Sequence, residues 1–189
     1  MSAVARTEAG PRPFRQGDLD ALCGAYAVVN AVRLAALPRR RLAHAPCAGL
    51  FAALVDELAE AGRLRAFVTG GVGTGTLARL LRRAAAWLEA EHSLALEVRR
   101  PFRGGDRLDA GARLRLLAEH LAQGGTSAIV GTGDHWTVVS VVRGGRLLLA
   151  DSHDRRYYVA AKAFGKAAAA SRLHLPGTFL LGVATPSGP

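Results

Sequence analysis

Apolar residues in the first half of the chain recur every three or four positions, the spacing of one face of an amphipathic helix. Leu50, Leu54 and Leu58 are the clearest example, and a glycine follows them as a helix stop. Thr76 and Asp109 stand where a side-chain oxygen can cap the first turn of a helix. The pattern predicts helices over residues 22–36, 46–61, 76–90 and 109–125.

The remaining apolar segments are shorter, partly alternating, and bounded by glycine and polar residues, as is typical of β-strands. Gly144 and Gly145 stand between two of them and predict a tight hairpin. Strands are expected over residues 94–98, 127–130, 136–142, 146–150, 157–159 and 178–183, with a short alanine-rich helix over 162–170. Helices followed by antiparallel strands imply an α+β fold in two lobes, an N-terminal helical lobe and a C-terminal antiparallel β-sheet.

The length of 189 residues and a hydrophobic content of 50% predict one folded domain, which we place at residues 13–184. Residues 1–12 and 185–189 are expected to be a flexible leader and tail. The sequence contains no run of about 18 apolar residues, so no membrane-spanning helix is predicted. The N-terminus also lacks the apolar centre of a secretory signal. These features favour a cytoplasmic protein that does not act within a membrane.

The chain is strongly basic, with a formal net charge of +10, and only Lys162 and Lys166 among its 25 basic residues are lysines. A basic surface favours acidic partners through long-range electrostatic fields. The arginines are scattered in pairs, without the interleaved exposed aromatic residues of a nucleic-acid-binding surface. We therefore expect a protein or peptide substrate, with acidic ones favoured, rather than a nucleic acid.

Neither a metal nor another cofactor is expected. Two cysteines, Cys23 and Cys47, cannot supply a CxxC…CxxC metal site and are too few for a secreted disulfide scaffold, so both are expected to be reduced. The glycine-rich segment 70–76 precedes a helix but lacks the lysine and the spacing of a phosphate-binding loop. It is expected to be a flexible loop near the cleft between the lobes.

Cys23 is the candidate nucleophile because it stands at the expected start of the first helix, where a thiolate gains stability. Polar residues precede it, and Gly24 would let a substrate backbone approach. Cys47 lies one residue into an amphipathic helix without such neighbours, and is interpreted as structural.

His135 is the candidate base because it opens an apolar run after a glycine-rich turn, at a loop-to-strand junction where functional groups are often presented. Trp136 beside it could shield the imidazole from water. His153 is the competitor, since it lies near the same edge of the expected sheet. His92 and His120 stand on helices beside charged residues and are expected to be solvated.

Two aspartates could orient His135. If the strands beside the two-glycine hairpin pair regularly, Asp154 lies opposite His135. Asp151 would then face Val138, and it would need a β-bulge or a strong twist to reach the imidazole. Register alone therefore favours Asp154.

Together these residues resemble the papain-like cysteine peptidase superfamily, and most closely its bacteriocin-processing (double-glycine leader) peptidases and their free-standing bacterial relatives. The likeness rests on Gln16, Cys23-Gly24-Ala25-Tyr26, His135-Trp136-Thr137-Val138-Val139 and residues 145–151. In that family a glutamine precedes the nucleophile, the base opens a strand, and an Asp or Asn ends the next strand. The resemblance implies a two-lobed papain-like fold with the site in the cleft between the helical lobe and the sheet.

The same resemblance implies Cys23 as nucleophile, His135 as general base and acid, Asp151 as the orienting acid and Gln16 as an oxyanion donor. It implies a thiol hydrolase that cleaves a peptide or isopeptide bond through a thioester intermediate. One alternative is an amide-transferring, deamidating or deubiquitinase-like effector, since ovarian-tumour-type deubiquitinases also show the pattern Asp20-x-x-Cys23. The other is a non-catalytic basic module that docks on an acidic partner.

Overall fold

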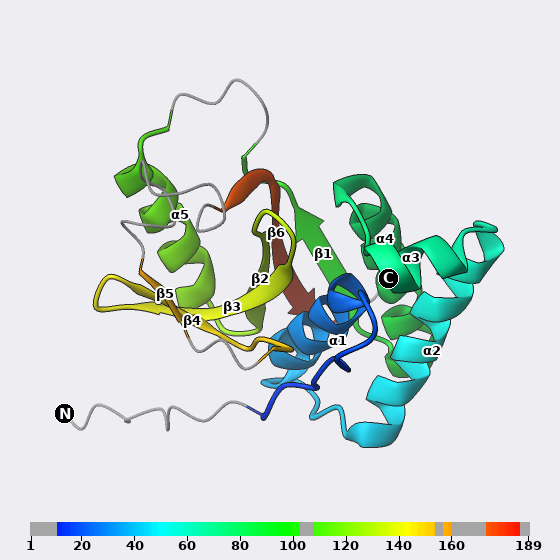
Figure 1. Ribbon diagram of the computed structural model, residues 1–189. Helices are drawn as coiled ribbons and strands as arrows, with labels where there is room; N and C mark the ends of the chain where they lie inside the picture. Colours follow the sequence, from blue (N-terminus) through cyan, green and yellow to red (C-terminus); the bar gives the residue numbers. More distant parts are fainter. Residues whose placement is uncertain (1–10, 103–107, 154–156, 160–172, 186–189) are drawn as a thin grey trace.

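The computed structural model describes residues 11–102, 108–153, 157–159 and 173–185. Its helices are α1 (Cys23–Ala36), α2 (His44–Glu60), α3 (Leu64–Gly70), α4 (Thr74–His92) and α5 (Ala110–Ala122). Its strands are β1 (Ala95–Arg99), β2 (Thr126–Gly131), β3 (Trp136–Arg143), β4 (Arg146–Leu149), β5 (Tyr157–Val159) and β6 (His174–Ala184). The strands form one antiparallel sheet in the order β1-β6-β2-β3-β4-β5, which confirms the α+β class (Figure 1).

Helices cover both faces of the sheet. Successive residues of a strand point to opposite sides, and the central strand β2 carries buried apolar residues on both. In β2, Ile129 belongs to the large core that α1, α2 and α4 share with the sheet. Its neighbours Ala128 and Val130 pack instead in a second core with Leu117 of α5. Figure 1 shows the result: α5 lies on one side of the sheet, and α1 and α4 lie on the other.

Most helix signals in the sequence are confirmed. The three leucines singled out in α2 are fully buried, and Gly62 follows that helix with a φ of +65°, as a C-terminal stop requires. The Asp109 carboxylate caps α5, since it accepts a hydrogen bond from the Ala112 backbone N–H at 2.6 Å. Thr76 is not a cap, because α4 begins at Thr74 with Gly73 in the N-cap position.

Some expectations are incomplete or fall outside the described residues. The sequence pattern did not predict α3, which has seven residues and buries only Phe67. The expected helix over 162–170 and the aspartate at position 154 lie outside the described residues. The expected leader and tail lie largely outside them as well.

The β3–β4 hairpin forms as predicted, but its strands do not pair regularly. Gly144 and Gly145 have φ values of +55° and +70°, the signs of a type I′ turn. Beyond it, Val141 pairs with Leu148, whereas Val139 pairs with Leu149. Ser140 is therefore an extra residue, a β-bulge that shifts the pairing of all preceding residues by one position.

Candidate active site

Cys23 is the first residue of α1 and only 6% exposed. The turn before it is shaped by Asp20, whose carboxylate accepts hydrogen bonds from the Gly17 backbone N–H at 3.1 Å and from that of Leu22 at 3.0 Å. No side chain caps the N-terminus of α1. The thiol thus lies where the first helical N–H groups lack intrahelical acceptors and favour negative charge.

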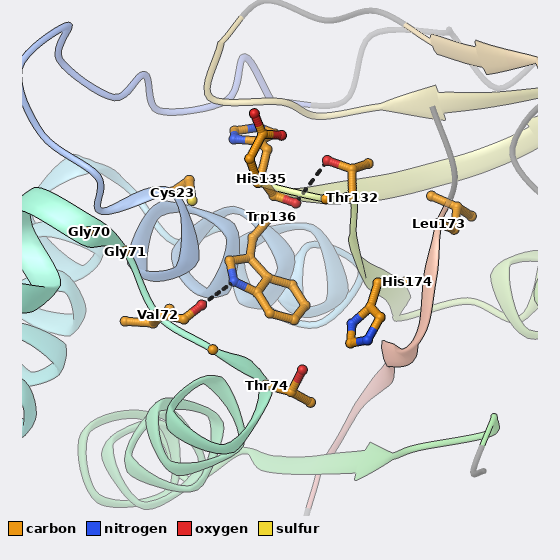
Figure 2. Close-up of a pocket in the computed structure, with 13 residues that line it drawn as sticks. Cys23, Gly70, Gly71, Val72, Thr74, Thr132, His135, Trp136, Leu173 and His174 are labelled. Carbon is orange, nitrogen blue, oxygen red and sulfur yellow. Dashed lines mark hydrogen bonds between the residues drawn. The ribbon is translucent and has the colours of Figure 1, made fainter. Parts of the chain in front are cut away.

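His135 ends a tight turn that connects β2 to β3. Its backbone carbonyl accepts hydrogen bonds from the Thr132 backbone N–H at 2.8 Å and from the Thr132 hydroxyl at 3.2 Å (Figure 2). The turn holds the imidazole directly before a central strand of the sheet, and the residue is only 5% exposed.

The structure brings Asp151 to His135. The Ala150 backbone N–H donates to the Val138 carbonyl at 2.9 Å, so continuing the pairing by one residue places Asp151 opposite Thr137. Thr137 and His135 are two residues apart and share a face of the sheet. The Asp151 Oδ2 accordingly lies 2.9 Å from the His135 Nε2.

Burial and charge act on this pair in opposite directions. Burial alone lowers the pKa of His135, but hydrogen bonds with Asp151 and Cys23 and the negative charge on both raise it from 6.5 to about 9. Burial raises the pKa of the Asp151 carboxyl, but the hydrogen bond and the positive charge of His135, together with further hydrogen bonds such as that from the His153 backbone N–H, outweigh burial and hold that pKa below its usual range. The pair is therefore an imidazolium and a carboxylate at neutral pH.

Cys23 and His135 line the same cavity and interact through their side chains (Figure 2). Because the Nε2 of His135 is bonded to Asp151, the ring nitrogen left for the thiol is Nδ1. Asp151 thus fixes the orientation of the imidazole that faces the sulfur. This is the arrangement that a thiol nucleophile requires of its base and its orienting acid.

His153, the competitor of His135, lies against it instead of replacing it. The two rings stack with centroids 4.7 Å apart and planes inclined by 16°. The His153 backbone N–H also donates to the Asp151 Oδ1 at 2.6 Å. His153 is itself exposed, so its ring stands between the buried imidazole and solvent.

Gln16 lies near these residues but is not among those that line the cavity. Its backbone N–H donates to the Ser152 carbonyl at 3.2 Å, which ties the segment before α1 to the end of the sheet. Its side-chain amide donates to the backbone carbonyl of Asp20, three residues before Cys23. One of the two amide hydrogens of Gln16 is therefore used within the turn.

The cavity has a volume of about 540 Å³. Its walls come from the start of α1, the glycine-rich segment between α3 and α4, the β2–β3 turn and the start of β6. They consist of Cys23, Gly70, Gly71, Val72, Gly73, Thr74, Thr132, Gly133, Asp134, His135, Trp136, Leu173 and His174 (Figure 2). The sequence placed the glycine-rich segment near the site, and it forms one wall.

Trp136 connects that wall to the sheet. Its indole Nε1 donates to the Val72 carbonyl at 2.7 Å. A Cβ added at Gly131 would lie 3.0 Å from the indole ring, and one at Gly177 would lie 2.9 Å from it. These glycines leave the space that the buried indole fills beside His135.

Two interpretations of the sequence need correction. Gly24 does not leave room for a substrate, because it is buried and an added Cβ would lie 2.3 Å from the Val72 Cγ2. His120 is not solvated: it is 5% exposed, and its Nε2 lies 3.1 Å from the Ser127 carbonyl and 3.0 Å from the Leu181 carbonyl. It joins α5 to the sheet.

Comparison of the chain with family models, curated proteins and solved structures finds no match. Among the helices that the structure describes, none has both the length and the apolar character needed to cross a membrane. The described residues contain no group of three or more His, Cys, Asp or Glu side chains placed to hold a metal ion.

Proposed function

We propose that this protein is a thiol hydrolase that cleaves a peptide or isopeptide bond through Cys23, His135 and Asp151. The observation that carries the proposal is the chain of side-chain contacts from the Cys23 thiol through His135 to the buried Asp151 carboxylate. A structural cysteine needs no charged partner, and burying an ion pair is costly. Cys47, which is 2% exposed and has its pKa raised by burial, has the environment of a structural cysteine.

In the proposed reaction, the sulfur of Cys23 attacks a carbonyl carbon, and the resulting C–S bond gives a tetrahedral oxyanion. Collapse of this intermediate breaks the C–N bond, and the leaving amine takes a proton from His135. Water then attacks the thioester, His135 takes one of its protons, and the sulfur leaves. The same acyl-enzyme would deliver its acyl group to an amine in an amide-transferring enzyme.

The oxyanion would be held by the backbone N–H of Cys23, the first residue of α1. Gln16 is the proposed second donor through the amide hydrogen that Asp20 does not use. In this proposal the fold is a two-lobed papain-like arrangement, with Cys23 on the helical lobe and His135 and Asp151 on the sheet. Glycine backbones along the cavity suit an extended segment of a protein or peptide substrate.

The decisive experiment compares two variants that each retain a single thiol. Cys47→Ala leaves only Cys23, and Cys23→Ala leaves only Cys47. We expect iodoacetamide at pH near 6 to label Cys23 at least tenfold faster than Cys47, and the substitution His135→Gln to remove the difference.

The same variants should be incubated with a mixture of proteome-derived peptides, and new termini identified by mass spectrometry. Cleavage by Cys47→Ala and its absence with Cys23→Ala would support the hydrolase. Equal, slow labelling of both thiols without cleavage would instead support the non-catalytic binding module.

A further inference from the structure

A second cavity, of about 480 Å³, lies between α4, β1 and β6. Its apolar lining includes Leu81, Leu96 and Phe179. Three exposed arginines also line it: Arg82 of α4, Arg99 at the end of β1 and Arg100 directly after that strand. The described lining contains no carboxylate. We call this cavity the arginine groove.

The arginine groove adjoins the cavity that holds Cys23. Trp136 lines the first cavity, Phe179 lines the second, and the centroids of their rings are 6.3 Å apart. Helix α4 also runs past both, since Thr74 lines the Cys23 cavity and Ala78 lines the groove. Residues four apart share one face of a helix, so Thr74, Ala78 and Arg82 form a continuous stripe.

We propose that the arginine groove binds acidic side chains of a polypeptide whose reactive bond lies at Cys23; this inference rests on the proposed function. Eight residues of helix separate Thr74 from Arg82, which at about 1.5 Å per residue is about 12 Å. An extended peptide spans about 3.3 Å per residue, so the acidic side chains would lie roughly three to five residues from that bond.

The charge of Arg100 is held over the apolar floor of the groove. The Arg100 guanidinium lies 5.4 Å from the centroid of the Phe179 ring, a cation–π contact that keeps it at the groove. Arg99 also lines the groove, and its Nη2 lies 3.3 Å from the His120 Nδ1. A carboxylate beside Arg82 and Arg100 would meet positive charge next to apolar surface, where ionic attraction is stronger than in bulk water.

The binding test uses a fluorescent ten-residue peptide with three consecutive aspartates, its asparagine counterpart, and protein with Cys23→Ala so that no reaction intervenes. We expect Arg82→Gln with Arg100→Gln to weaken binding of the aspartate peptide about tenfold, as the loss of two exposed charge contacts would. The matched control is Arg83→Gln with Arg41→Gln, which removes the same charge from exposed positions outside the groove. It should change the affinity less than twofold.

Equal losses in the two double variants, or equal affinity for the aspartate and asparagine peptides, would overturn the proposal. The proposal would also be overturned if single-stranded DNA of the same length bound more tightly than the aspartate peptide and did so through the same two arginines. That result would assign the groove to nucleic acid.

A second measurement connects the groove to Cys23. Peptides with a chloromethyl ketone at the C-terminus or a bromoacetyl group at the N-terminus carry three aspartates, three to five residues from the reactive group. We expect one of the two to alkylate Cys23 about tenfold faster than its asparagine counterpart, and only while Arg82 and Arg100 are present. Arginine-dependent binding with an inert Cys23 would refute the hydrolase and leave the groove standing; alkylation indifferent to the arginines would refute the groove alone.

Discussion

The imidazole of His153 stacks on that of His135, with ring centroids 4.7 Å apart and planes inclined by 16°. Because His153 is exposed and His135 is 5% exposed, the outer ring separates the inner one from solvent. The same residue contacts Asp151 through its backbone N–H at 2.6 Å. His153 thus restrains both members of the buried pair.

Removing this outer ring should impair the site without unfolding the protein. In His153→Ala the backbone contact to Asp151 remains, but the His135 ring gains room to rotate away from the thiol. We expect iodoacetamide labelling of Cys23 to slow by about tenfold, since loss of orientation is costly in such steps. His153→Phe, which restores a flat ring, should recover most of the rate. Equal rates in His153→Ala and wild type would show that stacking does not position His135.

The raised pKa of His135 predicts how stability depends on pH. The folded protein holds the imidazolium up to about pH 9, whereas the unfolded chain releases that proton near 6.5. The stabilisation is therefore fully present below pH 6.5 and is lost as the pH rises through 9. We expect it to be of the order of 1–3 kcal/mol in the free energy of unfolding.

Urea unfolding of wild type and His135→Gln at pH 6.5, 8 and 9.5 measures this contribution. The variant should lack the part of the decline that wild type shows between pH 6.5 and 9.5. His120 does not interfere with this measurement. Burial lowers its pKa, so its contribution to stability changes with pH only below about pH 6.5. Parallel curves for the two proteins would contradict the assigned ion pair.

The sequence could predict those parts of the fold that depend on local pattern. Periodic leucines locate α2, and the paired glycines locate the β3–β4 hairpin. A seven-residue helix such as α3 shows too few turns for a period to emerge. The burial of His120 could not be predicted because one of its partners, the Leu181 carbonyl, belongs to a strand that lies far along the sequence and meets α5 only in the folded sheet.

The same limit applies to the candidate site. Cys23 and His135 could be selected from their positions at element ends. The strand register favours Asp154 and only the family resemblance favours Asp151, because the contact between Asp151 and His135 depends on the bulge at Ser140. No residue type marks the bulge in this strand, because Ser140 stands among valines and reads as an ordinary polar position. Only the pairing of Val139 with Leu149 reveals that the register has shifted.

Deleting Ser140 should leave the acid beside the base, because Ser140 is the residue without a partner in the pairing. Regular pairing from the hairpin would then place Val139 opposite Leu149 and Asp151 opposite Thr137, which is the register of the intact protein. We expect a folded protein whose Cys23 is labelled at close to the wild-type rate. Ser140→Ala, which loses only the hydrogen bond from its hydroxyl to the Leu148 carbonyl at 3.1 Å, should keep both the bulge and the labelling rate. Labelling at least tenfold slower in the deletion variant would mean that the bend of the bulged strand, and not the pairing alone, brings Asp151 to His135.

The contact between Gly24 and Val72 predicts a position where one methyl group disturbs the site wall. A Cβ at Gly24 would lie 2.3 Å from the Val72 Cγ2, and the Val72 backbone is fixed by the hydrogen bond from Trp136. The clash is relieved only if the Val72 side chain rotates or its backbone moves, and moving the backbone would break that hydrogen bond. We expect Gly24→Ala to lower the free energy of unfolding by about 1–3 kcal/mol, the usual cost of overpacking, and to slow labelling of Cys23.

Two further variants separate this clash from the general effect of alanine in a helix. Gly75 lies near the start of α4 with nothing within 4 Å of an added Cβ, so Gly75→Ala should be neutral or stabilise slightly. Val72→Ala removes the methyl group that Gly24→Ala meets, so the double variant should be more stable than the two single losses predict. Urea unfolding of wild type, Gly24→Ala, Val72→Ala and the double variant measures this difference. If the two single losses simply add in the double variant, Gly24 is required by the backbone of α1 rather than by Val72.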